Sequence, residues 1–344
     1  MSHSPLRWGI LSTGRIAHTF AKAVQASASG RLVAVGSRGR ESAERFATEF
    51  GGLRAHGGYA ELLADPEVEA VYIATPHPQH AEWAIAAARA GKHILCEKPL
   101  TLNRADSERV VAAARAAGVT LMEAFMYRCH PQAMKLAELV REGAIGRLGL
   151  VQAAFGFHLD GPPGHRVFTN ALGGGGILDV GGYPVSMARL LVGAAQGRAF
   201  ADPVAVTGSA RLHPTEGTDL HAAATLHFEG EVLAQVACGV ALELENVVRV
   251  YGSDGWILVP EPWFAASERG MTRLVLHRRG GATEEIAAPA PHGLYVCEAD
   301  AFAAAVRAGL PEVSTMTWAD TLGNMAALDA WRAAAGVVYR GERG

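Results

Sequence analysis

The stretch that decides the fold is Trp8-Gly9-Ile10-Leu11-Ser12-Thr13-Gly14-Arg15-Ile16-Ala17, an apolar run that turns into a helical pattern. It matches the dinucleotide-binding fingerprint in a degenerate form, with Ser12 at the first glycine position. Gly14 would let the backbone approach a pyrophosphate, and Ala17 would let helix and strand pack closely. The helix N-terminus would supply N–H donors and a positive dipole. We therefore predict a cofactor-binding turn formed by Ser12, Thr13, Gly14, Arg15 and Ile16.

Short apolar runs alternate with segments of helical period as far as Ala124. This rhythm is typical of βαβ units, and runs that are apolar on both sides favour a parallel sheet covered on both faces. The fold class is therefore α/β, with an N-terminal Rossmann doubly wound parallel sheet in a domain of residues 1–124. The expected strands are 8–11, 32–37, 68–74, 93–97 and 120–124, and the expected helices are 16–25, 41–50, 81–90 and 105–117.

After Glu123 the pattern changes, because strand-like runs follow one another with few helices between them. Consecutive strands without crossovers indicate antiparallel pairing. We expect an α+β domain of residues 125–344 with a large open, mostly antiparallel sheet, joined tightly to the first domain. Its expected strands are 148–158, 204–212, 222–228, 232–240, 247–251, 257–259 and 274–279, and its expected helices are 133–142, 183–191, 294–308 and 318–335.

Composition excludes several classes of protein. The 344 residues carry a net charge of −3, and Lys and Arg are scattered, so no nucleic-acid partner is expected. No run approaches the roughly 18 apolar residues that span a bilayer, which predicts no membrane segment and a cytoplasmic protein. The four cysteines are far apart, which argues against disulfides and a zinc ribbon. His77 and His80 lack a third ligand nearby in the sequence, so no metal is expected.

The end of the expected strand 32–37 indicates which cofactor the first domain binds. An NAD-binding domain carries an Asp or Glu there, but this chain has Ser37-Arg38-Gly39-Arg40. A hydroxyl and a guanidinium suit a 2′-phosphate, which favours NADP over NAD through Ser37 and Arg38. The alternative is that these arginines are solvated residues at the start of a helix.

Two further stretches carry groups suited to proton transfer. Glu97-Lys98-Pro99 ends a strand, where doubly wound sheets bind ligands, so Glu97 and Lys98 are expected at the site, with Lys98–Pro99 a candidate cis peptide. Gly173 to Pro184 places Asp179 and Tyr183 four residues apart, on one face if the segment is helical. An ammonium beside a phenol stabilises the phenolate, so Lys98 and Tyr183 could exchange a proton with an alcohol. The alternative is an Asp cap, a packed Tyr and a glycine hinge.

Together these stretches resemble the Gfo/Idh/MocA oxidoreductase family, nearest to its NADP-dependent dihydrodiol dehydrogenase and D-xylose 1-dehydrogenase branch. The likeness rests on residues 8–17, Glu97-Lys-Pro-Leu-Thr101, Met122-Glu-Ala-Phe-Met-Tyr-Arg-Cys-His-Pro131 and residues 173–184. The resemblance implies an open sheet whose flat face forms homodimers or higher homo-oligomers. It implies that Lys98, Asp179 and Tyr183 line the nicotinamide, with Tyr183 as general acid/base. It also implies cofactor contacts for Thr75, Pro76, His77 and His80. Many relatives carry His in place of Tyr183, so roles known for those relatives need not transfer.

The expected reaction is hydride transfer between NADP(H) and a secondary alcohol or hemiacetal carbon of a sugar, polyol or cyclic trans-diol. Two alternatives remain open: a non-catalytic NAD(P)-sensing regulator, and a lyase or glycoside hydrolase that recycles a bound NAD. Aromatic and neighbouring side chains at strand ends could form the substrate wall. The candidates are Phe125, Met126, Tyr127, Phe157, His158, Arg166, Trp263 and Phe264.

Overall fold

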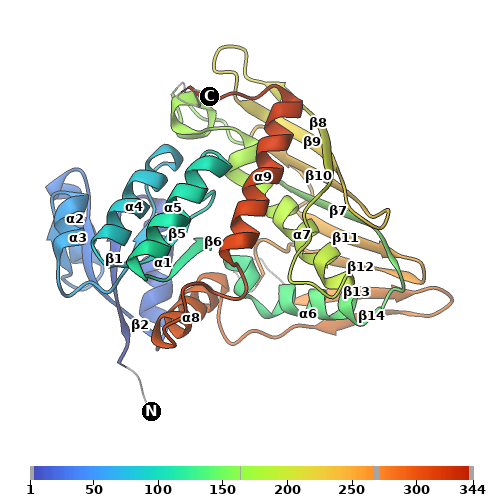
Figure 1. The fold of residues 1–344 in the computed structure, drawn as a ribbon, viewed down its shortest axis with the longest axis horizontal. Helices are drawn as coiled ribbons and strands as arrows, with labels where there is room; N and C mark the ends of the chain where they lie inside the picture. Colours follow the sequence, from blue (N-terminus) through green and yellow to red (C-terminus); the bar gives the residue numbers. More distant parts are fainter. Residues whose placement is uncertain (1–3, 163, 266–271, 341–344) are drawn as a thin grey trace. The chain divides into compact units, whose positions relative to one another are not determined.

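The computed structural model describes residues 4–162, 164–265 and 272–340, and the chain forms two compact units (Figure 1). Unit 1 comprises Met1–Cys129 and His292–Leu322, and unit 2 comprises His130–Pro291 and Gly323–Gly344. The first crossing between the units thus lies five residues beyond the boundary expected at residue 124. The segment 292–322 differs more, because it was expected in the second domain and belongs to unit 1.

Unit 1 is built on a six-stranded parallel sheet with the order β3-β2-β1-β4-β5-β6. This is the doubly wound arrangement predicted from the sequence, and its strand order reverses between β1 and β4. The strands are β1 (Leu6–Leu11), β2 (Gly30–Gly36), β3 (Arg54–His56), β4 (Ala70–Ile73), β5 (His93–Glu97) and β6 (Leu121–Ala124). The helices are α1 (Arg15–Ala26), α2 (Arg40–Glu49), α3 (Tyr59–Ala64), α4 (His80–Arg89), α5 (Arg104–Ala117) and α8 (Leu294–Arg307).

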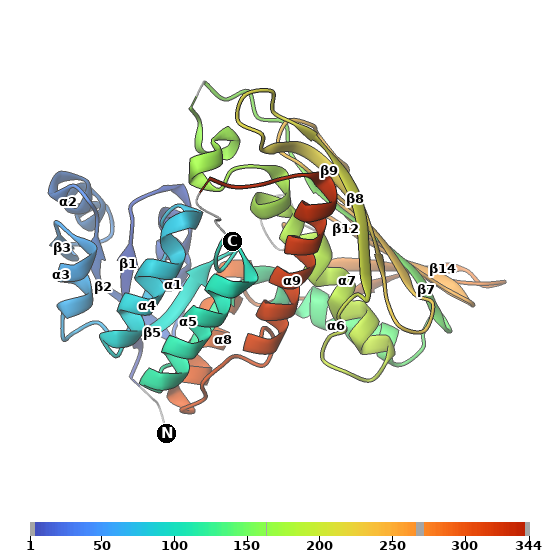
Figure 2. The same ribbon diagram turned by 45° about the horizontal axis from the view of Figure 1, so that its top comes forward.

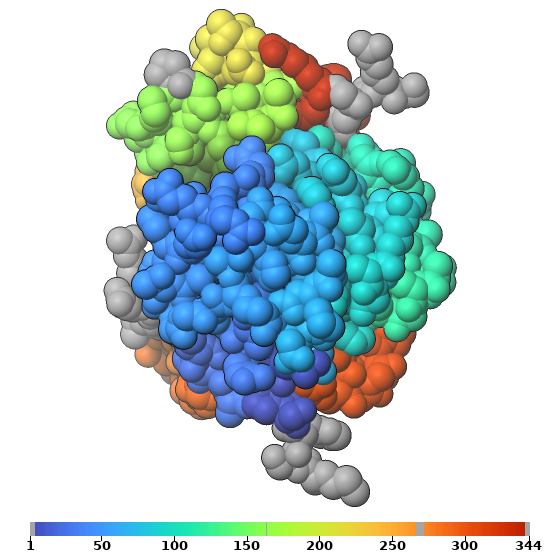
Figure 3. All heavy atoms as spheres, turned by 90° about the vertical axis from the view of Figure 1, so that its left-hand side faces the viewer, coloured from blue at the N-terminus to red at the C-terminus, as the bar shows by residue number. Residues whose placement is uncertain are grey.

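Both faces of this sheet are covered, so β4 and β6 are buried along their whole length. On one face, α3, α4 and α5 pack through small and branched side chains such as Ala87 and Val110. On the other face, Trp8 of β1 contacts Phe20 of α1 and Phe302 of α8, with ring centroids 5.1 and 5.2 Å apart. Figure 3 looks onto the part of unit 1 that carries α2 and α3, in blue.

Two elements of unit 1 were not predicted from the sequence, β3 and α3. A three-residue strand and a six-residue helix are too short to show a hydrophobic period. The return of α8 to unit 1 was missed for another reason: a helical pattern shows that a face is apolar but does not name its partner. Here the partner is α1, and hydrogen bonds of 2.5 Å from Ser27 and Ser29 to Asp300 fasten the contact.

Unit 2 is built on an eight-stranded sheet with the order β14-β13-β12-β11-β7-β10-β9-β8. Its pairs are antiparallel except β7 with β10, so the predicted mostly antiparallel sheet is correct. The strands are β7 (Leu148–Gly156), β8 (Ala205–Leu212), β9 (Asp219–His227), β10 (Leu233–Gly239), β11 (Val247–Gly252), β12 (Gly255–Pro260), β13 (Arg273–Arg278) and β14 (Thr283–Ala287). Of these, the short exposed β14 was not predicted.

Helices α6 (Pro131–Arg141) and α7 (Gly182–Ala195) lie on one face of the eight-stranded sheet (Figure 2). Over the described residues, no helix or strand covers the opposite face. A last helix, α9 (Trp318–Ala335), begins in unit 1 and ends in unit 2. A search of the helices in the described part of the chain finds none long and apolar enough to cross a membrane.

Candidate active site

The turn after β1 has the backbone of a glycine-rich phosphate-binding turn although it begins with serine. Ser12 has a φ of 96°, in the left-handed region that glycine favours, and its N–H donates to the Gly36 carbonyl at 2.9 Å. Gly14 is the N-cap of α1 and makes no side-chain cap hydrogen bond. Uncapped N–H groups at a helix start bind phosphate oxygens well, so residues 12–16 fit a pyrophosphate.

The side chains of Ser12, Arg38 and Tyr59 meet beyond the ends of β1 and β2. Ser37 is buried, Arg38 is exposed, and the Tyr59 hydroxyl of α3 hydrogen-bonds with Ser12 and Arg38. Burial raises the pKa of Tyr59, and the Arg38 charge together with these hydrogen bonds opposes the rise. Neither Ser37 nor Arg38 is a carboxylate, and the cluster presents hydroxyls and one guanidinium. It therefore fits the additional phosphate of NADP better than two bare ribose hydroxyls.

The ends of β4 and β5 are linked through His80. This side chain is fully buried, and its Nδ1 and Nε2 each lie 2.8 Å from a carbonyl oxygen, of Pro99 and Thr75 respectively. His80 thus holds two strand-end turns together. Thr75 and His77 are also buried and Pro76 is half-buried, and contact of these residues with a cofactor stays a prediction.

Lys98 stands on a turn whose backbone is fastened by buried acids. Its N–H donates to Glu97 Oε2 at 3.2 Å, and the Leu100 N–H donates to Glu123 Oε1 at 2.8 Å. The Lys98–Pro99 peptide is cis, as the sequence suggested. The Lys98 side chain is half-buried, whereas the Glu97 carboxylate lies beneath the turn and accepts a hydrogen bond from Tyr72. Glu97 is therefore placed to position Lys98.

In unit 2, Asp179 and Tyr183 stand where one kind of helix changes into another. Residues Ile177–Gly181 form a π-helix, which continues directly into α7. Single π-turns are rare and often lie at functional sites. Asp179 is buried, and Arg166 donates to its Oδ1 at 3.2 Å. Arg166, expected at a substrate wall, is thus an ion-pair partner of a predicted catalytic residue.

Tyr183 lies in an aromatic cluster that we define as Phe155, Tyr183, Trp263 and Phe264. Tyr183 meets Phe155 edge-on at 5.0 Å between ring centroids and Trp263 at 5.6 Å. Phe264 meets Phe155 at 5.6 Å, and Trp263 Nε1 donates to the Ala154 carbonyl at 2.8 Å. Both Tyr183 and Trp263 are buried, with 4% and 0% of their surface exposed. The structure thus brings two of the predicted wall residues, Trp263 and Phe264, into one apolar cluster with the Tyr183 phenol.

The remaining candidates for a substrate wall are divided between the two units. Phe125, Met126 and Tyr127 are buried within unit 1, where their short 3-10 turn packs against α8. Phe157 is half-buried, and the exposed His158 ring contacts Asp160 at 3.0 Å and the Ala241 carbonyl at 3.1 Å. Contact of these residues with a substrate stays a prediction. Within the described ranges no three His, Cys, Asp or Glu side chains are grouped to hold a metal ion.

Sequence reasoning missed Tyr59 and Phe155. The glycines before Tyr59 marked a turn, but the three-residue β3 that places the turn carries no periodic signal. Phe155 was within reach of the sequence, since it alternates in phase with the buried Val151 and Ala153 of β7.

Comparison with known families matches both units. Residues 6–125 match the family model described as the GFO_IDH_MocA oxidoreductase family with an NAD-binding Rossmann fold, and residues 133–258 match the GFO/IDH/MocA C-terminal domain. Among curated relatives, a trans-1,2-dihydrobenzene-1,2-diol dehydrogenase of Danio rerio is 34% identical over 97% of this chain and 98% of that protein.

Two solved structures are similar over nearly the whole chain. KijD10, a 3-ketoreductase from Actinomadura kijaniata in complex with NADP and TDP-benzene, has a TM-score of 0.86 and 32% identity, covering 96% of this chain and 98% of that one. Variants of KijD10 with one tyrosine changed to phenylalanine, or one lysine to alanine, were solved with the same two ligands. The aldose-aldose oxidoreductase of Caulobacter crescentus, complexed with glycerol, has a TM-score of 0.85 and 26% identity, covering 96% of this chain and 98% of that one.

Proposed function

Because the chain belongs to the Gfo/Idh/MocA oxidoreductase family, we propose that it transfers a hydride between NADP(H) and a secondary alcohol or hemiacetal carbon. The substrate class is a sugar, a polyol or a cyclic trans-diol. The observation that carries the proposal is Tyr183, a buried phenol set in the aromatic cluster beside the Arg166–Asp179 ion pair.

The residues of unit 1 hold the cofactor. The N–H groups at the start of α1 bind the pyrophosphate, while Ser37 and Arg38, with Tyr59 behind them, bind the 2′-phosphate. When bound, the nicotinamide ring accepts or donates the hydride. The phosphate preference is supported by the guanidinium of Arg38 at the position where NAD-binding domains have a carboxylate, and by KijD10, whose structures contain NADP.

Tyr183 is the general acid/base. In the oxidative direction its phenolate takes the substrate hydroxyl proton as the carbon loses hydride, and in the reductive direction its phenol returns that proton to the carbonyl oxygen. Lys98 hydrogen-bonds the same reacting oxygen and fixes its orientation, which lowers the entropic part of the barrier. Asp179 and Arg166 hold the start of the helix that carries Tyr183. In KijD10, too, one tyrosine and one lysine were each replaced for structural study, which is consistent with a role for these two residue types in the family.

The aromatic cluster supports a ring-shaped substrate. Phe155 and Phe264, backed by the fully buried Trp263, form an apolar surface near the Tyr183 phenol, and both sugars and cyclic diols present one apolar and one hydroxylated side. The names of the relatives span the same range, from a dihydrobenzene diol dehydrogenase to an aldose-aldose oxidoreductase. We therefore expect turnover of at least one cyclic compound that carries neighbouring hydroxyls.

The experiment is a screen of the purified protein with NADP and with NAD against aldoses, inositols and trans-1,2-dihydrobenzene-1,2-diol, read at the nicotinamide absorbance band. We expect NADP to be preferred, and Tyr183→Phe to lower kcat by about a hundredfold or more because the proton acceptor is gone. Tyr251→Phe is the matched control, since Tyr251 lies on β11 away from the aromatic cluster. A Tyr183→Phe rate within about threefold of wild type would overturn the acid/base role.

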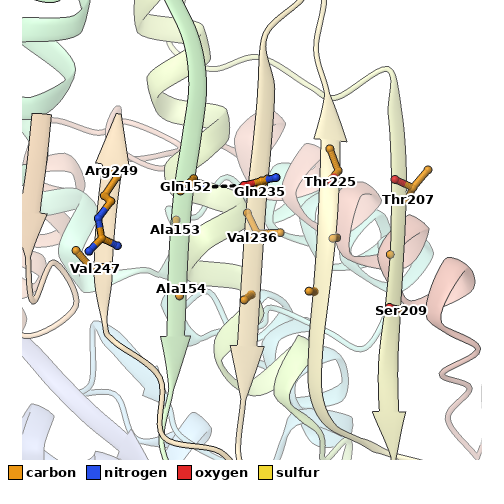
Figure 4. Close-up of a pocket in the computed structure, with 14 residues that line it drawn as sticks. Gln152, Ala153, Ala154, Thr207, Ser209, Thr225, Gln235, Val236, Val247 and Arg249 are labelled. Carbon is orange, nitrogen blue, oxygen red and sulfur yellow. Dashed lines mark hydrogen bonds between the residues drawn. The ribbon is translucent and has the colours of Figure 1, made fainter. Parts of the chain in front are cut away.

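We also propose that the chain forms a homodimer through the open face of the eight-stranded sheet. Five side chains form one row across this face: Arg249, Gln152, Gln235, Thr225 and Thr207 (Figure 4). Gln152 donates to Gln235 at 2.7 Å, and the hollow around the row is about 620 Å³ in volume and contains a single charged residue, Arg249. A surface that is uncharged apart from Arg249 and can both donate and accept hydrogen bonds is able to pair with its own copy about a two-fold axis.

A further inference from the structure

Asp219, the first residue of β9, is a fully buried acid that the proposed mechanism does not use. Its Oδ2 accepts the Ile177 N–H at 2.7 Å, and the backbone N–H groups of Gly176 and of Asp219 itself also bond to the carboxylate. Oδ1 has no hydrogen-bond partner among the described residues. The carboxylate thus lies at the start of the π-helix and accepts the N–H groups that a helix start leaves unpaired.

The glycine run 173–176 is shaped around this carboxylate. Gly175 has a φ of 110°, and a Cβ there would lie 2.3 Å from Asp219 Oδ1. A Cβ on Gly176 would lie 3.1 Å from Oδ2, and one on Gly174 would lie 2.5 Å from the Val167 carbonyl oxygen. Real Cβ atoms essentially never approach as closely as 2.3 or 2.5 Å, and 3.1 Å is a tight contact, so the backbone takes this course because positions 174 and 175 lack side chains.

The same loop fixes the backbone of the candidate site. The Gly175 carbonyl accepts the Asp179 N–H at 3.1 Å, and the Gly175 N–H donates to the Val167 carbonyl at 2.7 Å, next to Arg166. The Gly174 carbonyl accepts the Tyr339 hydroxyl at 2.6 Å. Movement of the loop would therefore shift both partners of the Arg166–Asp179 ion pair and the helix that leads to Tyr183.

We propose that Asp219 is a positioning residue for catalysis, whose carboxylate anchors the 173–176 loop and thereby sets the place of Asp179 and Tyr183. This inference rests on the proposed role of Tyr183. Asp219 acts through the backbone and has no contact of its own with a reacting atom in the proposed mechanism.

The electrostatics make this anchor sensitive to pH near neutrality. Burial raises the pKa of Asp219 to about 7, against the N–H groups of Ile177, Asp219 and Gly176 and the charge of Arg332 on α9. On β10, burial and the charges of Asp219 and Asp179 raise the pKa of Cys238, which stays a neutral thiol. The closed loop favours the neutral carboxyl, whereas a solvated Asp in an open loop ionises near about pH 4. The closed loop is therefore most stable at low pH and becomes easier to open as pH rises to about 7.

The first test uses the free protein and needs no substrate. Amide hydrogen exchange is measured across residues 174–179 between about pH 5 and pH 8.5, corrected for the intrinsic pH dependence. We expect protection of the Ile177 amide in the wild type to fall about tenfold or more as pH rises toward the pKa of Asp219, because opening releases a carboxyl that ionises more readily in water. In Asp219→Asn, which keeps the shape but cannot ionise, this pH dependence should be absent. Protection that is independent of pH in the wild type, or the same pH dependence in the variant, would overturn the anchor.

The second test is kinetic, with NADP and the fastest substrate of the screen. Asp219→Asn should lower kcat about tenfold or more while KM for NADP, bound by unit 1, stays within about twofold. Any change of kcat with pH that follows the ionisation of Asp219 near pH 7 should also disappear, which a purely structural loss would not cause. Wild-type kcat with a wild-type pH profile would overturn the positioning role.

The matched control is Asp202→Asn, which removes the charged partner of the buried Arg189 further along α7. It should lower the melting temperature yet leave the Ile177 amide and the pH profile as in wild type. If Tyr183→Phe remains active, the proposed function fails, but the exchange experiment still decides whether Asp219 anchors the loop. If Tyr183→Phe is inactive and Asp219→Asn is fully active, only the positioning role fails.

Discussion

Among single residues, Glu298 of α8 has an environment that opposes its own ionisation. It is fully buried, and neither of its carboxyl oxygens has a hydrogen-bond partner within the described ranges. Burial raises the pKa of Glu298 well above its usual range, and the charge of Glu97 raises it further. The Glu298 carboxyl of the folded protein therefore keeps its proton at pH values where the same group in the unfolded chain is ionised. This contribution to stability is fully present below the unfolded pKa, and it is lost as pH rises through the folded pKa.

Glu298→Gln should flatten that pH dependence. The amide cannot ionise, so between about pH 5 and pH 8 the wild type should lose roughly 1–3 kcal/mol of unfolding free energy relative to the variant. Urea unfolding at several pH values measures this difference. Glu69→Gln is a control of opposite sign, because hydrogen bonds from Arg307 and Arg7 outweigh burial and lower the pKa of Glu69. Parallel curves for wild type and Glu298→Gln would contradict the prediction.

At this scale the sequence predicted residues whose role follows from a local motif. Ser12 and Gly14 lie in the turn that the fingerprint predicted, and Arg38 and Lys98 stand at strand ends. Asp219 and Tyr59 could not be predicted, because their significance comes from contacts with residues more than twenty positions away. No local pattern marks a single acid in a strand as the anchor of a distant loop.

Among the elements, α8 closes the apolar face of unit 1 that β1 and α1 leave open. Phe302 has no exposed surface and packs on Trp8, whose other ring contact is Phe20. At the C-terminal end of α8, the Arg307 guanidinium donates two hydrogen bonds to the Glu69 carboxylate, at 3.2 and 3.3 Å. Unit 1 thus depends on a helix that lies 165 residues beyond the end of its first segment (294 − 129).

Phe302→Ala should therefore destabilise unit 1 even though residue 302 lies far from the Rossmann segment in sequence. We expect a loss of about 3–5 kcal/mol, the usual cost of removing a buried phenylalanine ring. Chemical denaturation followed by Trp fluorescence measures it, since Trp8 lies in direct contact. Leu310→Ala, at a half-exposed site, should stay within about 0.5 kcal/mol of wild type. Equal stability of the two variants would contradict the packing described for α8.

Long elements were predicted well because several helical or strand periods add up. The helix expected at 318–335 has these bounds in the structure, and β5 likewise matches the expected 93–97. The π-helix before α7 was expected only in part, as a turn with a helical relation between Asp179 and Tyr183. Its register depends on the 173–176 loop and on Asp219, so the local sequence does not determine it.

For the molecule as a whole, the open face of the eight-stranded sheet is the surface through which we propose that two chains form a dimer. The row from Arg249 to Thr207 crosses five strands, and the exposed Leu233 adds apolar area beside it. In a two-fold symmetric dimer both copies contribute the same face, so a single substitution appears at two places in the interface.

Gln235→Arg should separate the proposed dimer, because it places two like charges at the centre of the interface and breaks the Gln152–Gln235 hydrogen bond. Light scattering should give twice the chain mass of 36.1 kDa for wild type and a single chain mass for the variant. Thr283→Arg on the edge strand β14 is the control and should remain dimeric. A monomeric wild type would exclude this interface.

The return of residues 292–322 to unit 1 also sets the order in which the protein can be made. The first 129 residues leave the ribosome long before α8 is synthesised. Until then the apolar surface around Trp8 and Phe20 lacks its partner Phe302. The whole eight-stranded sheet of unit 2 is translated in that interval. The domain that is begun first is thus among the last to be completed, and a nascent chain stalled before residue 292 presents an unfinished nucleotide-binding fold to chaperones and proteases.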